Sequence, residues 1–203
     1  MKSLIIGAAG FVGAYLIQHL KQELGHHIAV TKLPNERIRV NKNVYPGYGT
    51  DSDRNDPDRN NQDGNNPDRN NPDRNDLNGN HDLDRDDLDI YDLDILDQDA
   101  VLKLMQAVQP DYVFHLAAQS SVAAAWKHPG MTVDVNIRGA VHVLEAVRRM
   151  QKRPRILLVG SGEEYGLVRP QEIPIGEENR LYPGNIYAAT KACQTMIGGI
   201  YAR

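Results

Sequence analysis

Two residues near the end of the chain have the types and spacing needed to transfer a proton. Tyr187 and Lys191 lie four positions apart in YAATK, so on a helix they share one face. A lysine ammonium lowers the pKa of a neighbouring phenol because positive charge stabilises phenolate. Ser161, in GSGEEYG after an apolar run, could hydrogen-bond a carbonyl that the tyrosine protonates. Read singly, Tyr187 and Lys191 also suit a surface pair, Ser161 a turn or helix cap, and Glu163 a solvated charge.

Three glycines near the N-terminus predict a phosphate site. Gly7, Gly10 and Gly13 in GAAGFVG follow the apolar run SLIIG and precede a segment with helical spacing. Glycines there permit a tight turn and let N–H groups at a helix N-terminus approach a pyrophosphate. The motif alone is weak, because many glycine-rich turns bind nothing. Its place between a strand and a helix strengthens it.

The segments that must position these residues alternate between strand and helix. The apolar patterns predict strands at 3–7, 27–31, 111–118 and 155–162, a further candidate strand at 90–96, helices at 12–24, 98–109, 131–150 and 187–201, and a loop at 168–184. Alternation favours a parallel sheet covered on both faces, the doubly wound, Rossmann-type α/β fold. Such sheets bind ligands at the carboxyl ends of their strands.

Length and charge fit one nucleotide-binding domain. The 203 residues suffice for one sizeable core but not for two full domains. Residues 51–99 hold 17 Asp and 5 Arg, a charge of −12, which leaves +8 on the flanks because the whole chain carries −4. A basic balance suits an anionic ligand such as a nucleotide or phosphate.

Cysteine content and the N-terminus indicate the compartment. The single cysteine, Cys193, excludes an internal disulfide and suits a reducing environment, and we expect it buried or half-buried on a helix rather than catalytic. The apolar run at 4–9 is too short to span a membrane and lacks a cleavage site after it. A soluble, cytoplasmic protein with neither a membrane nor a nucleic-acid partner is expected.

An Asp/Asn-rich repeat interrupts the pattern. Six pentads run from Asp51 to Asn80, and three more follow His81. The first six contain almost no apolar residue, so burial cannot offset the entropy of ordering them, and we expect a disordered insertion over about 45–89. A pentapeptide β-helix would need an apolar residue at each pentad centre, which the first five pentads lack. A calcium loop would need a glycine and a downstream Glu in register, and no register supplies both, so no metal site is expected.

Together the motifs resemble those of the extended short-chain dehydrogenase/reductases, which include nucleotide-sugar epimerases, dehydratases and reductases. The matching segments follow the family's order and cover nearly all of the chain outside the repeat. They are GAAGFVG, DIL (94–96), HLAAQSSV (115–122), NIRGAVHVLEA (136–146), GSGEEYG (160–166) and YAATK. Their conjunction is far more specific than any one glycine motif.

The resemblance implies a role for each of these segments. Tyr187 would be the general acid/base, Lys191 would bind the nicotinamide ribose, and Ser161 would polarise the C4 oxygen of a sugar. The cofactor-binding residues would be Gly7, Gly10, Phe11, Val12, Gly13, Lys32, Asp94, Ile95, Leu116, Ala117, Ala118, Tyr187 and Lys191, with Asp94 and Ile95 at the adenine. The substrate residues would be Gln119, Ser120, Ser161 and Glu163. The family also implies a homodimer through the helices near 131–150 and 187–201.

Within the family, HLAAQSSV and EEYG most resemble the GDP-4-keto-6-deoxy-mannose reductases, with the GDP-mannose 4,6-dehydratases as close relatives. The expected reaction is therefore reduction of the C4 ketone of a GDP-4-keto-6-deoxyhexose. In a dehydratase, Glu163 would abstract the C5 proton, a step that a reductase does not require. The apolar glycine loop is less typical of dehydratases. A different class stays open, namely a dinucleotide-binding fragment without activity.

Cofactor choice rests on the end of the second strand. An acidic residue often follows that strand in NAD enzymes, whereas here VTKLPNERIR places Lys32 nearest. The sequence therefore leans toward NADP, with Lys32 or Arg37 near the 2′-phosphate. A solvated basic loop explains the same residues equally well.

Two departures from the family are large. The chain ends at Arg203, where the family continues for roughly another hundred residues, the scale of a small domain. The C-terminal substrate domain is therefore expected to be absent, leaving an incomplete Rossmann-type domain over 1–203. Deleting 45–89 would restore a short passage into IYDLDIL, so the repeat resembles an expansion of the DLDIL unit in a tolerant loop. We hypothesise that the repeat binds no ligand.

Overall fold

The computed structural model describes residues 1–38 and 88–203 and contains a five-stranded sheet. The strands are β1 (Lys2–Ile6), β2 (His27–Lys32), β3 (Leu88–Asp92), β4 (Tyr112–His115) and β5 (Arg155–Leu158). All neighbours pair in parallel, in the order β3-β2-β1-β4-β5. The predicted disordered insertion lies outside the described residues, apart from Leu88 and Asp89.

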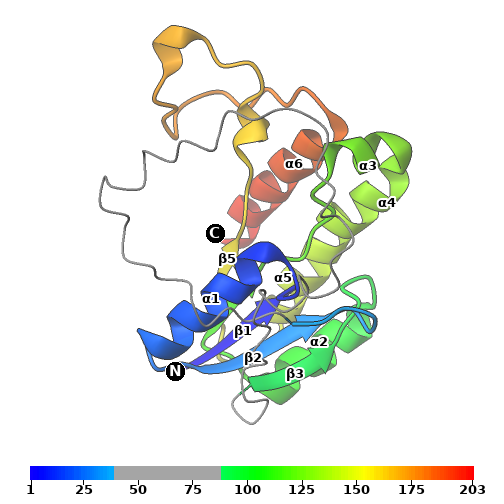
Figure 1. The fold of residues 1–203 in the computed structure, drawn as a ribbon, viewed down its shortest axis with the longest axis vertical. Helices are drawn as coiled ribbons and strands as arrows, with labels where there is room; N and C mark the ends of the chain where they lie inside the picture. Colours follow the sequence, from blue (N-terminus) through cyan, green and yellow to red (C-terminus); the bar gives the residue numbers. More distant parts are fainter. Residues whose placement is uncertain (39–87) are drawn as a thin grey trace, which may run out of the picture.

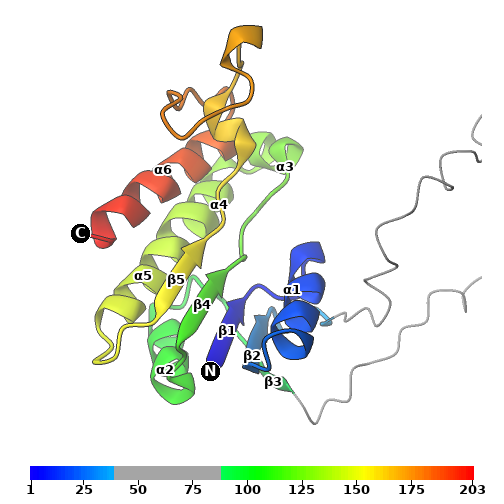
Figure 2. The same ribbon diagram turned by 90° about the vertical axis from the view of Figure 1, so that its left-hand side faces the viewer.

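Helices cover both faces of the sheet, which confirms the predicted doubly wound architecture (Figures 1 and 2). On one face lies α1 (Phe11–Gln22), and on the other lie α2 (Gln98–Val108) and α5 (Ala140–Arg148). The remaining α-helices are α3 (Val122–Lys127), α4 (Pro129–Val133) and α6 (Ile186–Tyr201). Between β5 and α6, a long loop with the short 3₁₀ turns η7 (Gly162–Tyr165) and η8 (Pro170–Glu172) extends beyond the sheet (Figure 1).

The central strand β1 is buried on both faces because its neighbours and both helical layers enclose it. Ile5 faces α1 and packs in one apolar cluster with Ile17, whereas Leu4 packs in a second cluster with Met105 of α2 and Val143 of α5. Successive side chains of a strand point to opposite faces, so an uninterrupted apolar run supplies both clusters.

Several predicted boundaries were wrong. The strand predicted at 90–96 begins at Leu88, inside the predicted insertion, and ends at Asp92. The strand predicted at 111–118 ends at His115, because the Leu116 and Ala117 N–H groups both bond the Ile6 carbonyl and the chain turns out of the sheet. Similarly, β5 ends at Leu158 rather than at 162.

The helix predicted at 131–150 is divided into three parts. Pro129 starts α4, residues Asp134–Gly139 form the π-helix η6, and α5 follows. The sequence pattern did not predict α3, which Ser121 caps by accepting the Ala124 N–H. Cys193 is half-buried in α6, as predicted. Across 1–38 and 88–203, none of the helices combines the length and the apolar character that crossing a bilayer would require.

Candidate functional site

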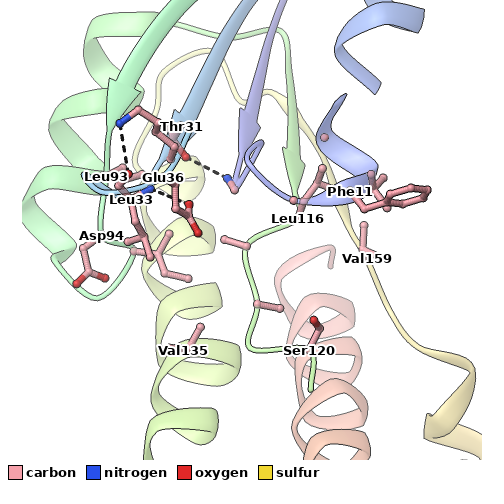
Figure 3. Close-up of a pocket in the computed structure, with 18 of the residues that line it drawn as sticks. Phe11, Thr31, Leu33, Glu36, Leu93, Asp94, Leu116, Ser120, Val135 and Val159 are labelled. Carbon is pink, nitrogen blue, oxygen red and sulfur yellow. Dashed lines mark hydrogen bonds between the residues drawn. The ribbon is translucent and has the colours of Figure 1, made fainter. Parts of the chain in front are cut away.

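The carboxyl ends of the central strands enclose one cavity of about 590 Å³ (Figure 3). The register pairs Ile6 with His115 and His115 with Leu158, so the residues that follow β1, β4 and β5 come side by side. Figure 3 shows Leu33, Glu36 and Asp94 on one side of the cavity and Phe11, Leu116 and Val159 on the other. Ser120 and Val135 lie below them.

Of the residues predicted to bind a cofactor, all except Arg37 line this cavity. These residues are Gly7, Gly10, Phe11, Val12, Gly13, Lys32, Asp94, Ile95, Leu116, Ala117, Ala118, Tyr187 and Lys191. They come from segments nearly two hundred residues apart in the sequence and meet because the parallel strands end at one edge. The cavity therefore extends from the glycine turn near the N-terminus of the chain to the helix that carries Tyr187.

The glycine turn fits the close approach of a phosphate. Gly7 has φ +84°, and a Cβ there would lie 2.6 Å from the backbone of Ala117. Gly10 begins α1, and no described side chain caps that end. A Cβ on Gly10 would meet Gly7 O at 3.8 Å, so this side of the turn is open. A helix N-terminus that no side chain caps, next to a turn whose glycines leave the backbone accessible, is the arrangement that suits a dinucleotide pyrophosphate.

The end of β2 carries charges of both signs. The Lys32 ammonium donates to Asp92 Oδ1 at 2.5 Å. Glu36, which the sequence analysis missed, lines the cavity and accepts the Leu33 N–H at 3.1 Å. An acid four residues beyond a strand end was the available signal. Arg37, the other predicted 2′-phosphate ligand, does not belong to the described lining of the cavity.

Tyr187 and Lys191 lie at the other end of the cavity. Lys191 is 3% exposed, and its ammonium donates to Gln194 Oε1 at 2.9 Å. Burial lowers the pKa of Lys191, whereas the negative charge of Glu164 acts to raise it. Tyr187 is half-buried one helical turn before Lys191. The lysine that should tune the phenol is therefore buried and hydrogen-bonded.

Only one of the four predicted substrate residues belongs to the described lining of the cavity. Ser120 lines the cavity, while Gln119, Ser161 and Glu163 do not belong to its described lining. Ser161 follows the lining residue Gly160 and begins η7, where its Oγ accepts the Glu163 N–H at 3.3 Å. Glu163 Oε2 accepts Asn185 Nδ2–H at 2.6 Å. Ser161 therefore lies next to a lining residue, whereas the Glu163 carboxylate bonds Asn185, which is not among the described lining residues.

Gln119 is held by a buried asparagine that the sequence analysis did not single out. Asn136 Oδ1 accepts the Gln119 N–H at 2.8 Å, and its Nδ2 donates to Gln119 O at 3.0 Å and to Thr190 Oγ1 at 2.9 Å. Asn136 therefore ties the loop after β4 to α6. It lies in the π-helix, a distortion that often marks functional sites. Sequence periodicity gives no signal for such a distortion.

His115 is a second buried polar residue at this edge. Its side chain is 2% exposed, and neither ring nitrogen has a hydrogen-bond partner among the described residues. Burial, together with the nearby charge of Lys191, lowers the pKa of His115 to about 4. The imidazole is therefore neutral at pH 7 and adds no charge beside Lys191. As for metals, the described part of the chain gathers no group of three or more His, Cys, Asp or Glu side chains suited to hold an ion.

Comparison with known proteins gives a consistent result. A sequence model of the NAD dependent epimerase/dehydratase family matches residues 3–203. GDP-mannose 4,6-dehydratase of Yersinia enterocolitica is 39% identical over 93 residues, which are 45% of this chain and 24% of that protein. GDP-6-deoxy-D-mannose reductase of Pseudomonas aeruginosa is 37% identical over 82 residues, which are 40% of this chain and 27% of that protein.

Among solved structures, the UDP-glucose 4-epimerase of Thermus thermophilus in complex with NAD superposes with a TM-score of 0.69 at 23% identity. The match covers 100% of this chain and 51% of that chain. At this identity the likeness shows the fold. The chain thus spans about half of that structure and about a quarter of the curated relatives that it matches.

Proposed function

Because the chain belongs to the NAD-dependent epimerase/dehydratase family, we propose that it binds NAD(P) in the cavity and reduces the C4 ketone of a GDP-4-keto-6-deoxyhexose. The observation that carries the proposal is the single cavity that joins the open N-terminus of α1 to Tyr187 and Lys191. A dinucleotide long enough to span it would reach from the glycine turn to the tyrosine. The partial matches to GDP-sugar enzymes support the sugar class.

The proposed chemistry assigns one task to each side chain. When bound, the reduced dinucleotide supplies hydride to C4. Tyr187 Oη donates a proton to the C4 oxygen, and the Lys191 ammonium stabilises the phenolate that this leaves. Ser161 Oγ accepts the Glu163 N–H, which leaves its hydroxyl hydrogen free to donate to the same C4 oxygen. Tyr187 and Ser161 together would polarise the ketone.

A second candidate reaction is dehydration of GDP-mannose. The observation that favours it is the Glu163 carboxylate, which Asn185 holds at the start of the helix that carries Tyr187. A base at this point could abstract the C5 proton, the step that water loss requires. Reduction needs no such base, so Glu163→Gln separates the two reactions. We expect this variant to keep most reductase activity and to lose dehydratase activity.

Turnover by the chain tests the proposal. We expect purified protein to oxidise NADPH or NADH in the presence of GDP-4-keto-6-deoxymannose. The reaction is monitored by the decrease in the absorbance of the reduced nicotinamide. Tyr187→Phe should lower kcat by about 10²- to 10⁴-fold, because it removes the proton donor. Tyr182→Phe, at an exposed loop tyrosine, is the matched control. Cofactor binding without turnover of either sugar would instead support a non-catalytic dinucleotide-binding fragment.

The choice between NAD and NADP depends on Lys32 and Glu36. The ammonium of Lys32 favours a 2′-phosphate but is bonded to Asp92, while the Glu36 carboxylate favours a free ribose 2′-hydroxyl. We therefore propose that the cavity binds a nicotinamide dinucleotide, and that Lys32 and Glu36 set the preference between NAD and NADP. Lys32→Ala should lower the ratio of NADP to NAD affinity, and Glu36→Gln should raise it. Titration of each cofactor by fluorescence measures both.

We also propose a homodimer formed through α5 and α6. These helices lie side by side (Figure 2), and α6 leaves Met196 and Ile200 exposed. Exposed apolar side chains on a packed helical pair suit burial against a second copy. Sedimentation of the protein and of Ile200→Glu would test this, since an interface charge should shift the species toward monomer.

A further inference from the structure

Glu164, the second glutamate of GEEYG, joins η7, which Ser161 caps, to α6, which carries Tyr187 and Lys191. Glu164 is 4% exposed. Its Oε1 accepts the Ser161 N–H at 2.7 Å, and its Oε2 accepts the Thr195 hydroxyl at 3.0 Å. One carboxylate therefore bonds η7 with one oxygen and α6 with the other, across 31 positions of sequence.

We propose that Glu164 is a positioning residue that fixes Ser161 relative to Tyr187 and Lys191. The inference rests on the proposed function, because it assumes that these three side chains act together. Glu164 does not itself line the cavity, so it acts through Ser161 and α6. It differs from Glu163, whose carboxylate is exposed.

The backbone around Glu164 leaves the carboxylate little freedom. A Cβ on Gly160 would lie 2.9 Å from Glu164 Oε1, so the segment that follows β5 passes directly against the carboxylate. Ser161 and Glu164 also form a capping box around η7, since the Ser161 side chain bonds the turn while the Glu164 side chain bonds Ser161 N. The position of Ser161 is thereby tied to the position of Glu164.

Two anchors together attach η7 to α6. Glu163 bonds Asn185, the N-cap of α6, and Glu164 bonds Thr195 ten residues later, about 15 Å along the axis. Tyr187 and Lys191 lie between these two points. Rotation of η7 about either anchor alone would move Ser161 away from the tyrosine, whereas two anchors prevent it.

Charge adds a second effect on the same helix. The groups that face Lys191 are Glu164 from η7, His115 from β4, and Gln194 and Tyr187 on α6 itself. Burial lowers the pKa of Lys191, and the Glu164 carboxylate opposes that fall. His115 is neutral at pH 7. Glu164 is thus the carboxylate that favours the charged lysine on which a low tyrosine pKa depends.

Three variants separate these effects. Glu164→Gln keeps an acceptor for Ser161 N and a polar partner for Thr195 but removes the charge. Glu164→Leu removes both hydrogen bonds. Thr195→Val, at an exposed helix position, removes one bond and serves as a mild variant if Glu164→Leu fails to fold. Glu177→Leu, at an exposed loop glutamate, is the matched control.

The first readout needs neither cofactor nor substrate. The chain has five serines, Ser3, Ser52, Ser120, Ser121 and Ser161, so ¹⁵N-serine labelling gives at most five amide resonances. Ser161→Ala assigns the Ser161 signal by its loss. We expect Glu164→Leu to shift this signal strongly, Thr195→Val to shift it less, and Glu177→Leu to leave it unchanged. An unshifted Ser161 amide in folded Glu164→Leu would overturn the proposal.

The second readout is the pH profile of turnover. Loss of the carboxylate hydrogen bonds in Glu164→Leu should lower kcat by about 10- to 100-fold with KM nearly unchanged, the range expected for hydrogen bonds to a charged group. Glu164→Gln should retain more activity but lose it at lower pH than wild type, because Lys191 deprotonates more easily. A wild-type profile in Glu164→Gln would overturn the charge effect. If wild type itself turns nothing over, the proposed function fails, and the serine spectrum still decides the position of Ser161.

Discussion

At the scale of single residues, Gly7 and Gly10 separate the needs of the fold from the needs of a ligand. A Cβ on Gly7 would collide with the Ala117 backbone at 2.6 Å and require a left-handed φ. A Cβ on Gly10 would have room and an ordinary φ of −73°. The two glycines lie three positions apart in one motif, but the fold requires glycine at position 7, whereas only a bound ligand would require it at position 10.

We therefore expect opposite results from two alanine substitutions. Gly7→Ala should lower the free energy of unfolding by at least about 1–2 kcal/mol, from backbone strain before any clash. Gly10→Ala should cost less than about 1 kcal/mol, the scale of a helix N-cap change. The Gly10 variant should nevertheless weaken dinucleotide binding, since the new methyl group enters the cavity. Urea unfolding and cofactor titration measure the two effects, and a Gly10→Ala protein with wild-type affinity would place the dinucleotide elsewhere.

His115 should make stability depend on pH. Its folded pKa of about 4 lies below the ordinary 6.5, so the unfolded chain binds a proton that the folded chain refuses. The stability that this supplies is complete above pH 6.5 and is lost as the pH falls toward 4. His115→Leu should be within about 1 kcal/mol of wild type at pH 7, since both ring nitrogens lack described partners.

Near pH 4.5 the order should change. There His115→Leu should be more stable than wild type by about 2 kcal/mol, because the unfolded wild-type chain gains a proton at His115 that the folded chain still largely excludes. Urea unfolding at the two pH values measures the difference, and His19→Gln on exposed α1 surface is the control. Equal pH dependence in both proteins would mean that His115 is solvated.

The sequence predicted residues that line the cavity, such as Gly7, Tyr187 and Lys191, but not the residues that support them. Gly7, Tyr187 and Lys191 could be found because their types and spacing carry the chemistry. Glu164 could have been found from its S-x-x-E spacing after Ser161, which signals a capping box. The pairing of Lys32 with Asp92 could not, because it joins two strands across 60 positions of sequence.

At the scale of elements, Asn185 connects helix capping to the site. Its Oδ1 caps α6 by accepting the Ala188 N–H at 2.8 Å, while its Nδ2 holds Glu163. Asn185→Ala should cost about 1 kcal/mol of unfolding free energy, whereas Asn185→Ser keeps a capping oxygen and should cost a few tenths. Urea unfolding distinguishes them. Both variants release Glu163, so equal stability losses would show that the Glu163 bond, rather than the cap, stabilises α6.

Long apolar periods predicted the elements well, and their ends poorly. The spacing in 98–109 and 187–201 predicted α2 and α6 almost to the residue, since both helices bury one face. The ends of β4 and β5 were missed because apolar residues continue past the point where the chain leaves the sheet. Residues 131–150 read as one helix, because a π-turn at Asp134–Gly139 keeps the apolar period nearly intact.

At the scale of the whole molecule, the insertion can be tested by its boundaries. Residues 33–87 connect the end of β2 to the start of β3. Removing 45–87 leaves 12 residues, which can span about 40 Å, twice the roughly 20 Å length of β2. The shorter connection should raise the free energy of unfolding by about 1 kcal/mol through lower loop-closure entropy. Cofactor affinity should not change.

The originally predicted boundary supplies the control. Removing 45–89 also deletes Leu88 and Asp89, which pair with Ile28 and Ala29 of β2. We therefore expect the longer deletion to be less stable than the shorter one when both are unfolded in urea. A collapse of stability or of cofactor affinity in the 45–87 deletion would give the repeat a role.

We infer that the described part of the chain holds a dinucleotide site that binds cofactor. Thermal unfolding of the 203-residue protein, alone and with NADPH or NADH in excess, tests this inference. At a hundred times the dissociation constant, binding to the folded state should add about 2.7 kcal/mol and raise the midpoint, and Gly10→Ala should reduce that rise. No shift with either cofactor, from a protein that unfolds cooperatively, would contradict the claim.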